Sequence, residues 1–261
     1  MNKLFRTFFI FLLLLSTRTS VANPLDINDS RAERSSYSAR QAQSHDLQGL
    51  YALNTQTFDT PRQSLSCLDK LYSNAPIAQN ELGNLLQRVT ADTQAQVILP
   101  DVKSYQRAAE KVASKFKGDA SQITDLARAS IVSNSISELM QSYYALSEQA
   151  QVVKQKNRFA EPKASGYRDL NLLVRLPESG MIAEVQLHLK DIADIKSGPE
   201  HKVYEQVQQI EANAIKQQRA LSEFETAQIA KLRQESHKLY HKAWLNYKRV
   251  DERLLLTNSV A

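Results

Sequence analysis

The strongest constraint on the fold is a strand-like segment in which polar and apolar side chains alternate without interruption. It covers residues 183–190 (AEVQLHLK), and successive side chains of a strand point to opposite faces of a sheet. The polar face carries Glu184, Gln186, His188 and Lys190, and the apolar face carries Val185, Leu187 and Leu189. A sheet with one solvated face gives the same alternation, so the pattern predicts a strand and does not by itself identify a site.

Further strand-like segments surround this one, and helical segments enclose the group. The other predicted strands are 123–132, 152–159 and 169–176, separated by Pro and Gly turn signals. Helical spacing of apolar residues covers 61–86, 103–116 and 136–150, and it returns after Gly198. The sequence Ser222-Glu223-Phe224-Glu225 is a capping box that begins the last long helix. We therefore predict an α+β fold, with a small mixed sheet of about four to five strands flanked by helices and with long C-terminal helices.

The N-terminus has the three parts of a cleavable export signal. Lys3 and Arg6 precede an apolar run at 8–15, and small residues lead to a cleavage point after Ala22. The apolar run is shorter than the roughly 20 residues that a membrane-spanning helix needs. An uncleaved membrane anchor is the alternative, but Arg18 interrupts it. We expect a periplasmic or secreted protein with no membrane segment after cleavage of residues 1–22.

The remaining chain is predicted to have a polar N-terminal arm, one domain and a terminal helix. The flexible arm is assigned to 23–60, the domain to 61–220 and the C-terminal helix to 221–261. The chain has 33 Lys and Arg and 28 Asp and Glu; three of the basic residues lie in 1–22, which leaves 30 against 28. This balance gives no case for a general nucleic-acid or membrane surface. The single cysteine, Cys67, excludes an internal disulfide and is expected to be a small buried residue.

Two parts of the chain carry side chains suited to chemistry. Asp125 begins an otherwise apolar segment, where an acid is costly unless it has a partner such as a cation. The turn 162–168 (PKASGYR) has two cations and an aromatic ring. His237 and His241 have the spacing of a metal-binding pair on a helix, but no third ligand is evident. We expect these two histidines to lie on a surface that also shows Tyr240 and Trp244.

The order of these motifs resembles a known family. They are Lys103-Ser104 with Lys111 eight residues on, Asp125, PKASGY at 162–167, AEVQ at 183–186 and His201-x-x-Tyr204. In this order they resemble the RelA/SpoT-type nucleotidyltransferase domain, whose members are pyrophosphokinases that make alarmone nucleotides. The resemblance covers roughly residues 100 to 205 and implies a nucleotidyltransferase-like sheet.

The resemblance implies a metal site and a donor site. Asp125 and Glu184, on neighbouring strands, would hold Mg²⁺, a hard cation that prefers carboxylate oxygens. In the family an acceptor 3′-hydroxyl attacks the β-phosphorus of ATP and AMP leaves, and Glu184 would also take the hydroxyl proton. Lys103 and Lys111 match lysines that neutralise the donor triphosphate. Eight residues are a little over two helical turns, so both lysines are expected to point the same way.

The resemblance also implies an acceptor site. The ring of Tyr167 matches the one on which the acceptor base stacks, and Lys163 would reach the acceptor phosphates. Lys156 matches another cation at the edge of the site, and Arg168 is assigned to the same acceptor group. Gln186, His201 and Tyr204 are expected to serve in packing and hydrogen bonding.

Some positions depart from the family pattern. Asp101 and Ser130 stand where arginines usually sandwich the donor adenine, with Arg107, Arg128 and Arg158 as candidate replacements. Asn171 and Asn157 replace a common histidine and a common aspartate. The metal and phosphate positions are therefore kept, while the adenine clamp is not.

Together these features predict an exported, Mg²⁺-dependent pyrophosphokinase that acts on ATP and the 3′-hydroxyl of a nucleotide or RNA. The alternative is a degenerate nucleotide-binding or partner-binding module that keeps the fold without turnover. Periplasm and medium hold little ATP. An exported enzyme would therefore act in another cell as an effector or toxin, or would have lost its activity.

Overall fold

The computed structural model describes residues 45–198 and 200–258, all of them within the compact unit Gln41–Ala261. The predicted signal peptide (1–22) and the arm as far as residue 44 lie outside the described residues. Among the described helices, none is long and apolar enough to cross a membrane.

The centre of the unit is a mixed sheet of six strands. In chain order they are β1 (Gln56–Thr57), β2 (Gln96–Ile98), β3 (Arg128–Ser133), β4 (Gln151–Asn157), β5 (Leu170–Arg175) and β6 (Ile182–Leu189). Their order across the sheet is β1-β4-β5-β6-β3-β2, with β3 and β6 parallel and every other pair antiparallel. The predicted α+β class is confirmed. The strand count is higher than expected because β1 and β2 are edge strands of two and three residues, too short to show a period.

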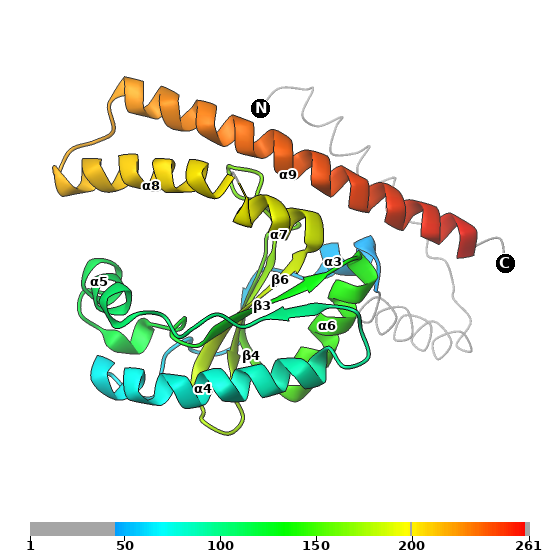
Figure 1. Cartoon of the computed structure of the whole chain (residues 1–261), viewed down its shortest axis with the longest axis horizontal. Helices are drawn as coiled ribbons and strands as arrows, with labels where there is room; N and C mark the ends of the chain where they lie inside the picture. The colour runs from blue at the N-terminus through cyan, green and yellow to red at the C-terminus, as the bar shows by residue number, and fades with distance from the viewer. Residues whose placement is uncertain (1–44, 199, 259–261) are drawn as a thin grey trace, which may run out of the picture. The chain divides into compact units, whose positions relative to one another are not determined.

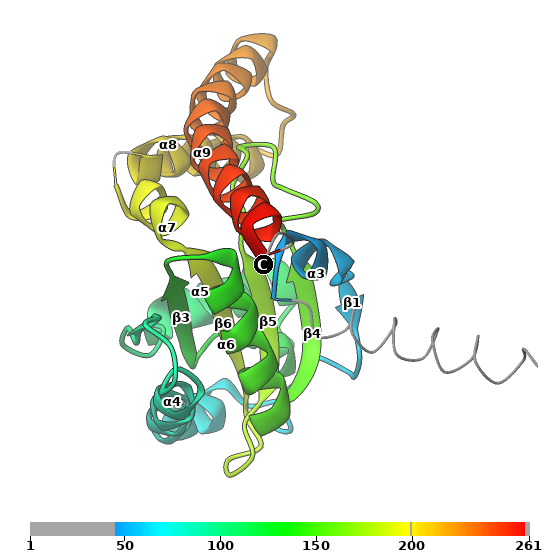
Figure 2. The ribbon, with the colours of Figure 1, turned by 90° about the vertical axis from the view of Figure 1, so that its right-hand side faces the viewer.

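Helices cover the sheet in two groups (Figures 1 and 2). Their bounds are α3 (Leu47–Ala52), α4 (Leu68–Val89), α5 (Tyr105–Phe116), α6 (Ile136–Gln149), α7 (Lys190–Ser197), α8 (Glu200–Lys216) and α9 (Glu223–Asn258). The helices α4 and α6 contact each other and the strand β3. The helix α7 follows β6 directly, and α8 and α9 run side by side beyond it. The long C-terminal helices are therefore confirmed.

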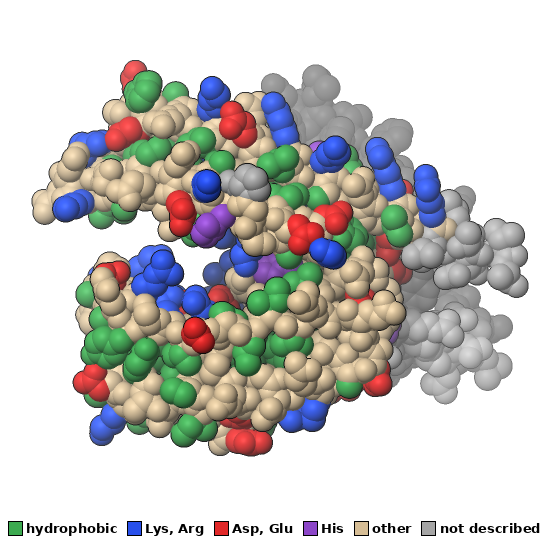
Figure 3. All heavy atoms as spheres, in the orientation of Figure 1, with side chains coloured by type: hydrophobic (Ala, Val, Ile, Leu, Met, Phe, Trp, Pro, Cys, Tyr) green, Lys and Arg blue, Asp and Glu red, His purple; other side chains and the backbone are tan. Residues whose placement is uncertain are grey.

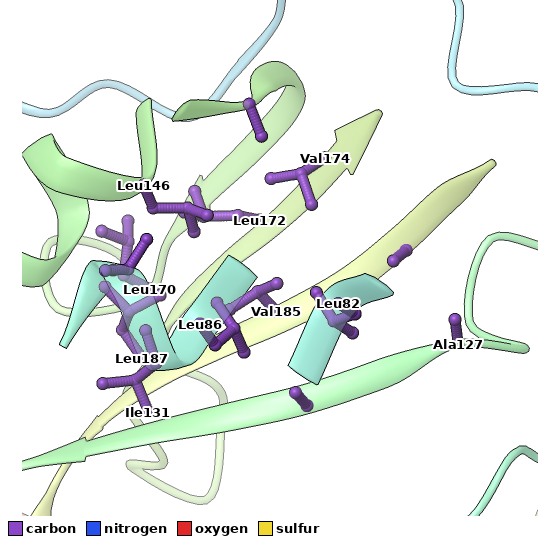
Figure 4. Packing of buried hydrophobic residues seen from close by; sticks show 14 of the residues in the cluster. Leu82, Leu86, Ala127, Ile131, Leu146, Leu170, Leu172, Val174, Val185 and Leu187 are labelled. Atoms are coloured by element: carbon purple, nitrogen blue, oxygen red, sulfur yellow. The ribbon is translucent and has the colours of Figure 1, made fainter. Parts of the chain in front are cut away.

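The hydrophobic core lies between the sheet and the helices α4 and α6 (Figure 4). The apolar face predicted for β6 is confirmed, because Val185, Leu187 and Leu189 are fully buried. Leu82 and Leu86 of α4 pack over this face. Burial of one such side chain contributes about 1.5 to 3 kcal/mol, so this layer holds β6 and its polar face in place.

Two glutamines fix the beginnings of the central strands. Gln79 of α4 donates to Arg128 O and accepts from Arg128 N, both at 2.9 Å. Gln63 bonds both backbone groups of Ile182, again at 2.9 Å. Because each amide side chain satisfies a donor and an acceptor of a buried strand end, the parallel β3–β6 pair starts in a defined register.

The flexible arm predicted for 23–60 is wrong from residue 45 onward. Asp46 caps α3 by accepting from Gly49 N at 2.8 Å, and Leu50 is fully buried. The Asn157 side chain then donates to Leu50 O at 2.7 Å and Leu53 O at 2.8 Å. These contacts join residues about a hundred positions apart, and local composition carries no signal of them.

Several smaller expectations are also corrected. Pro76 lies inside α4 and does not interrupt it. Cys67 is exposed, and it precedes the first residue of α4. Tyr240 and Trp244 of α9 are 1% and 2% exposed, so they belong to the core and not to the surface.

The start of α9 agrees with its capping sequence. Ser222 N donates to the Glu225 carboxylate at 2.8 Å, and Glu225 N donates to the Ser222 hydroxyl at 3.2 Å. This reciprocal pair satisfies two backbone donors at the helix start, which is the physical basis of the motif.

Candidate active site

The described residues enclose a pocket of about 600 Å³ between the polar face of β6 and the helices α8 and α9. Figure 3 shows the surface hollowed between α8 and the part of the domain that carries α5, with Lys and Arg side chains gathered on the α5 side. A volume of this size is typical of small-molecule sites. Of the predicted site residues, the pocket lining includes Lys163, Tyr167, Glu184, Gln186, His201 and Tyr204.

Glu184 and Gln186 reach the pocket because of the alternation along β6. Both are half-buried, while their neighbours Val185 and Leu187 are fully buried. Asn171, on the adjacent strand β5, donates to a Glu184 oxygen at 2.8 Å and orients the carboxylate. The predicted face of β6 is therefore the floor of the pocket as far as Gln186.

Asp125 is not on a strand, which corrects the sequence prediction. It lies in the segment before β3, and Glu184 N donates to Ala127 O in that same segment at 3.1 Å. The two predicted metal ligands are thus carried by adjoining backbone segments at one end of the parallel β3–β6 pair.

Both predicted donor-site lysines contact Asp125. Lys103 Nζ and Lys111 Nζ lie 2.9 Å and 2.8 Å from Asp125 Oδ2. Lys103 precedes the N-cap Ser104, so the prediction that both lysines share one helix is wrong, although their ammonium groups do converge. Two cations around one carboxylate leave a local excess of positive charge, which suits an anionic phosphate chain.

The ionisation of Asp125 follows from this setting. Burial alone would raise the pKa of its carboxyl group, but Lys111 and Lys103 outweigh burial and hold the pKa below its usual value. Asp125 Oδ1 is buried and has no hydrogen-bond partner among the residues that the structure describes. An unpaired buried carboxylate oxygen is costly unless a further cation binds it.

This orphaned oxygen is the structural test of the implied Mg²⁺ site. Asp125 Oδ1 and the Glu184 carboxylate supply hard oxygen ligands of the kind that Mg²⁺ prefers, and few protein ligands are needed because Mg²⁺ keeps several waters. The residues present therefore fit the ion. No cluster of three or more potential metal-ligating side chains occurs in the described ranges 45–198 and 200–258. That finding also leaves His237 and His241, whose rings stack 5.7 Å apart, without a third ligand there.

Tyr167 is more enclosed than the expected stacking platform. Its side chain is 7% exposed, and its ring meets Tyr240 edge-on at 5.7 Å. The ammonium groups of Lys163 and Lys196 lie 5.0 Å and 6.0 Å from the ring centroid. Cation–π contacts of this kind occupy the ring, so a base would have to displace a lysine before stacking there.

The Tyr167 hydroxyl belongs to a buried network of polar side chains. Its hydroxyl donates to Asp169 at 2.8 Å and lies 2.8 Å from His188 Nε2. Burial, and then the charge of Lys196, lowers the pKa of His188 to about 3, so the ring is neutral. Lys196 Nζ also lies 3.5 Å from His188 Nε2, and whether that nitrogen donates or accepts depends on the imidazole tautomer. Burial raises the pKa of Tyr167, with Asp169 adding to the effect.

The remaining predicted acceptor residues differ in position. Lys163 lines the pocket, and loss of hydration there, with Arg158 nearby, lowers its pKa. Lys156 is exposed on β4 opposite Asn171 and is not part of the pocket lining.

Arg168 points away from the pocket, which corrects its assignment. It donates to Phe159 O at 2.8 Å, and its guanidinium lies 5.4 Å from the Trp244 ring. Tyr167 lines the pocket, whereas its neighbour Arg168 does not.

His201 and Tyr204 lie at the beginning of α8, as predicted, but they face the pocket and are not packed in the core. The Tyr204 side chain is 46% exposed, and the His201 imidazole lies 3.2 Å from Glu205. Both residues were expected to serve in packing and hydrogen bonding, and the exposure of Tyr204 shows that its ring is not packed in the core.

The three candidate replacements for the adenine-clamp arginines have different surroundings. Arg158 lines the pocket and pairs with Asp169 at 2.5 Å. Arg128 lies opposite Glu184 in the β3–β6 register, and Arg107 is exposed on α5. Ser130, two residues after Arg128 on β3, lies opposite Gln186 in the same register.

Several pocket residues were not singled out from the sequence. Lys196 of α7 donates to Gln186 at 2.9 Å, and burial lowers its pKa. Glu200 is buried and accepts from the Tyr240 hydroxyl at 2.8 Å. Arg233 of α9 pairs with Glu211 of α8 at 2.7 Å. Helical periodicity indicated which faces of α8 and α9 are buried, but not that the two helices roof a pocket.

Comparison with known proteins agrees with this geometry. Residues 101–210 match the family model described as the region found in RelA / SpoT proteins. Over these residues the chain is similar to the RelA/SpoT region. The matched residues include Lys103, Lys111, Asp125, Glu184 and the pocket-lining residues of α8 as far as Gln208. No curated protein matches the chain.

Solved structures with the RelA/SpoT fold resemble the chain at low sequence identity. The small alarmone synthetase 2 from Bacillus subtilis is 19% identical, with a TM-score of 0.54, over 74% of this chain and 98% of that chain. The complex of the Type VI effector Tas1 with its immunity protein gives 20% identity and a TM-score of 0.50, over 67% and 94%. The pyrophosphokinase-like fold of the chain is therefore established by both comparisons.

Proposed function

We propose that this chain is a pyrophosphokinase that transfers pyrophosphate from ATP to the 3′-hydroxyl of a nucleotide or RNA. The observation that carries the proposal is the position of the Asp125 carboxylate, with its two lysines, beside the strand end from which Glu184 faces the pocket. A cationic phosphate site thus adjoins a pocket that contains a carboxylate. The RelA/SpoT match supports the same reaction class.

The proposed chemistry uses each charged group for one task. The acceptor 3′-oxygen attacks the β-phosphorus, the bond between the β-phosphorus and the bridging oxygen to the α-phosphate breaks, and AMP leaves with that oxygen. The Glu184 carboxylate takes the hydroxyl proton. Lys103 and Lys111 balance the donor phosphate charge, since transfer of this kind depends mainly on positioning and charge stabilisation. When bound by Asp125 and Glu184, Mg²⁺ would neutralise charge on the phosphate oxygens.

Export to the periplasm or medium is part of the proposal, and the signal-like sequence of residues 1–22 supports it. Delivery into another cell, where ATP is plentiful, would reconcile export with an ATP-consuming site. A Type VI effector has the same fold, and this likeness is compatible with such a role.

The test is release of AMP from ATP by the full-length chain with Mg²⁺ and one acceptor at a time, using GDP, GTP, ADP, ATP and tRNA. We expect AMP with at least one acceptor, and loss of at least a hundredfold in Asp125→Ala and Glu184→Ala. The matched control is Asp92→Ala, an exposed acid in the turn after α4 that does not line the pocket. Equal activity in all four proteins, or no AMP with any acceptor, refutes the proposal.

A nucleotide-binding module without turnover is the second candidate. Asp101 and Ser130, in place of the adenine-clamp arginines, are the observation in its favour. Such a module binds nucleotides in equilibrium dialysis and releases no AMP, which separates it from the enzyme.

A further inference from the structure

One face of α9 carries a row of basic side chains, which we call the basic ridge. Its members are spaced seven, four and seven residues apart, at Lys231, Lys238, Lys242 and Arg249. Steps of this size keep to one face of a helix. All four residues are exposed, and none forms an ion pair with any residue that the structure describes. Figure 3 shows Lys and Arg side chains at intervals along this helix.

The two signs of charge are segregated on α9. Within its described part, Glu235 is the one acid reached from the basic ridge by the same steps, four residues after Lys231 and seven before Lys242. A helix face that only meets solvent is typically laced with charges of alternating sign. The near balance of charge over the whole chain, which gave no case for a membrane surface, therefore conceals a cationic ridge about 27 Å long.

Exposed apolar side chains continue the basic ridge at the turn between α8 and α9. Phe224 comes seven residues before Lys231, on the same face, and is 78% exposed. Ile215, in the last turn of α8, is 75% exposed, and Leu221, between the two helices, is 37% exposed. Large apolar side chains grouped on a surface mark a place that meets another protein or a membrane.

A cationic helix face that ends in exposed apolar side chains has the chemistry of a bilayer-binding surface. Anionic headgroups attract the basic ridge, and Phe224 and Ile215 can enter the boundary between the headgroups and the acyl chains. The phosphate backbone of a nucleic acid would also attract the basic ridge. It offers no apolar partner to Ile215 and Leu221, so the turn favours a bilayer.

We infer that the basic ridge and the apolar turn beside it bind the surface of an anionic phospholipid bilayer. This surface lies outside the pocket, and the inference does not rest on the proposed function. Tyr240, which lines the pocket, comes nine residues after Lys231, which is about two and a half helical turns. The pocket and the basic ridge are therefore on opposite sides of α9, and a bilayer bound to the ridge leaves the pocket open.

The test is co-sedimentation of the full-length chain with vesicles of phosphatidylglycerol and phosphatidylcholine in equal amounts, and with vesicles of phosphatidylcholine alone. The ridge variant combines four substitutions: Lys231→Gln, Lys238→Gln, Lys242→Gln and Arg249→Gln. The control variant removes the same charge from exposed positions on α4, α5 and α8 that do not line the pocket: Lys70→Gln, Arg88→Gln, Lys115→Gln and Lys202→Gln. All three proteins keep residues 1–44, so the signal-like segment is common to them.

The expected effect follows from the number of charges. A basic residue near an anionic bilayer raises the affinity about fivefold, so the ridge variant should bind the anionic vesicles about a hundredfold or more weakly. The control variant should stay within about threefold of wild type, because its changes lie away from the ridge. Phe224→Ser combined with Ile215→Ser should weaken binding about tenfold, and this loss should persist at high salt, which screens only the charges.

Two results overturn the inference. One is equal affinity of the wild type and the ridge variant for anionic vesicles, or an equal loss in the control variant. The other is tighter binding of the wild type to a DNA duplex than to anionic vesicles, which would assign the ridge to nucleic acid. Urea midpoints equal to that of the wild type show that a loss of binding in the ridge variant is not a loss of folding. Release of AMP by the ridge variant should match the wild type, so the vesicle result and the proposed function are tested separately.

Discussion

Substitution of Gly166 by alanine tests how the turn at 162–168 is fitted against α9. Gly166 has φ +77, and an added β-carbon would lie 3.0 Å from the backbone Cα of His237. Gly180 has φ +66, and nothing lies within 4 Å of its added β-carbon. Both substitutions therefore incur the left-handed backbone penalty, but only the first meets a helix.

The magnitudes follow from these two geometries. A left-handed alanine costs about 1 to 2 kcal/mol, and the reduced entropy of the unfolded chain returns about 0.4 to 1 kcal/mol. Gly180→Ala should therefore lower the free energy of unfolding by roughly 0 to 1.6 kcal/mol. Gly166→Ala adds an overpacking cost of about 1 to 3 kcal/mol, because a helix backbone yields less easily than the end of a side chain.

Urea unfolding followed by tryptophan fluorescence measures both values. The only tryptophan of the chain, Trp244, is 2% exposed on α9, so it reports directly on the helix that the added methyl group would displace. The comparison is valid if the dependence of the free energy on urea is the same in both variants. Losses within about 0.5 kcal/mol of each other would refute a tight fit between the turn and α9.

Three further predictions concern stability. Asp125→Asn should lower the free energy of unfolding by about 2 to 4 kcal/mol at pH 7, because it leaves two partly buried lysines without their counter-charge. The folded pKa of Asp125 is below its unfolded value, so its contribution to the free energy of unfolding is present above about pH 4 and is lost as pH falls through the folded pKa. Urea unfolding from pH 7 downward should therefore show a shrinking difference in free energy of unfolding between wild type and Asp125→Asn. A difference that stays constant with pH would contradict the ion pairs. Leu187→Ala should lower the free energy of unfolding by about 2 to 5 kcal/mol. Leu239→Ala, at a site that is 49% exposed, should lower it by less than about 0.5 kcal/mol. Equal urea midpoints for the two variants would contradict the burial of this face of β6. Asn157→Ala should cost about 1 to 3 kcal/mol and speed amide hydrogen exchange in α3 first, and unchanged exchange there would show that these hydrogen bonds do not hold α3.

The sheet and its polar face could be predicted because their signal is local. Alternation along β6 depends only on neighbouring residues, and Asn171 of β5 lies opposite Gln186 of β6. The capping box of α9 is local in the same sense.

The missed elements depend on contacts between distant parts of the chain. The helix α3 is six residues long and is held by Asn157, and Leu47 N donates to Asp251, 204 residues away, at 3.0 Å. The strand β2 has three residues and pairs with β3 at an edge. Short elements of this kind are stabilised by tertiary packing, so composition alone made the first of them look like an arm.

The candidate site likewise combines features that a local sequence pattern indicates with features that depend on contacts between distant residues. The resemblance assigned Lys103 and Lys111 to the donor phosphates and Asp125 to the metal, and the structure brings the three side chains into contact, with Asp125 before its strand and Lys103 before its helix. The exposure of Tyr204 and the enclosure of Tyr167 depend on α8 and α9 folding back over the sheet. That arrangement is a property of tertiary structure, and no local pattern encodes it.

The central claim is the transfer of pyrophosphate, and the fate of each ATP phosphate tests it most directly. ATP labelled separately at the α-, β- or γ-phosphorus is incubated with Mg²⁺, the full-length chain and its acceptor, and the products are separated. The account predicts that β- and γ-label move together onto the acceptor in equal amounts while α-label remains in AMP. Transfer of γ-label alone, transfer of α-label, or release of either as free phosphate would contradict it.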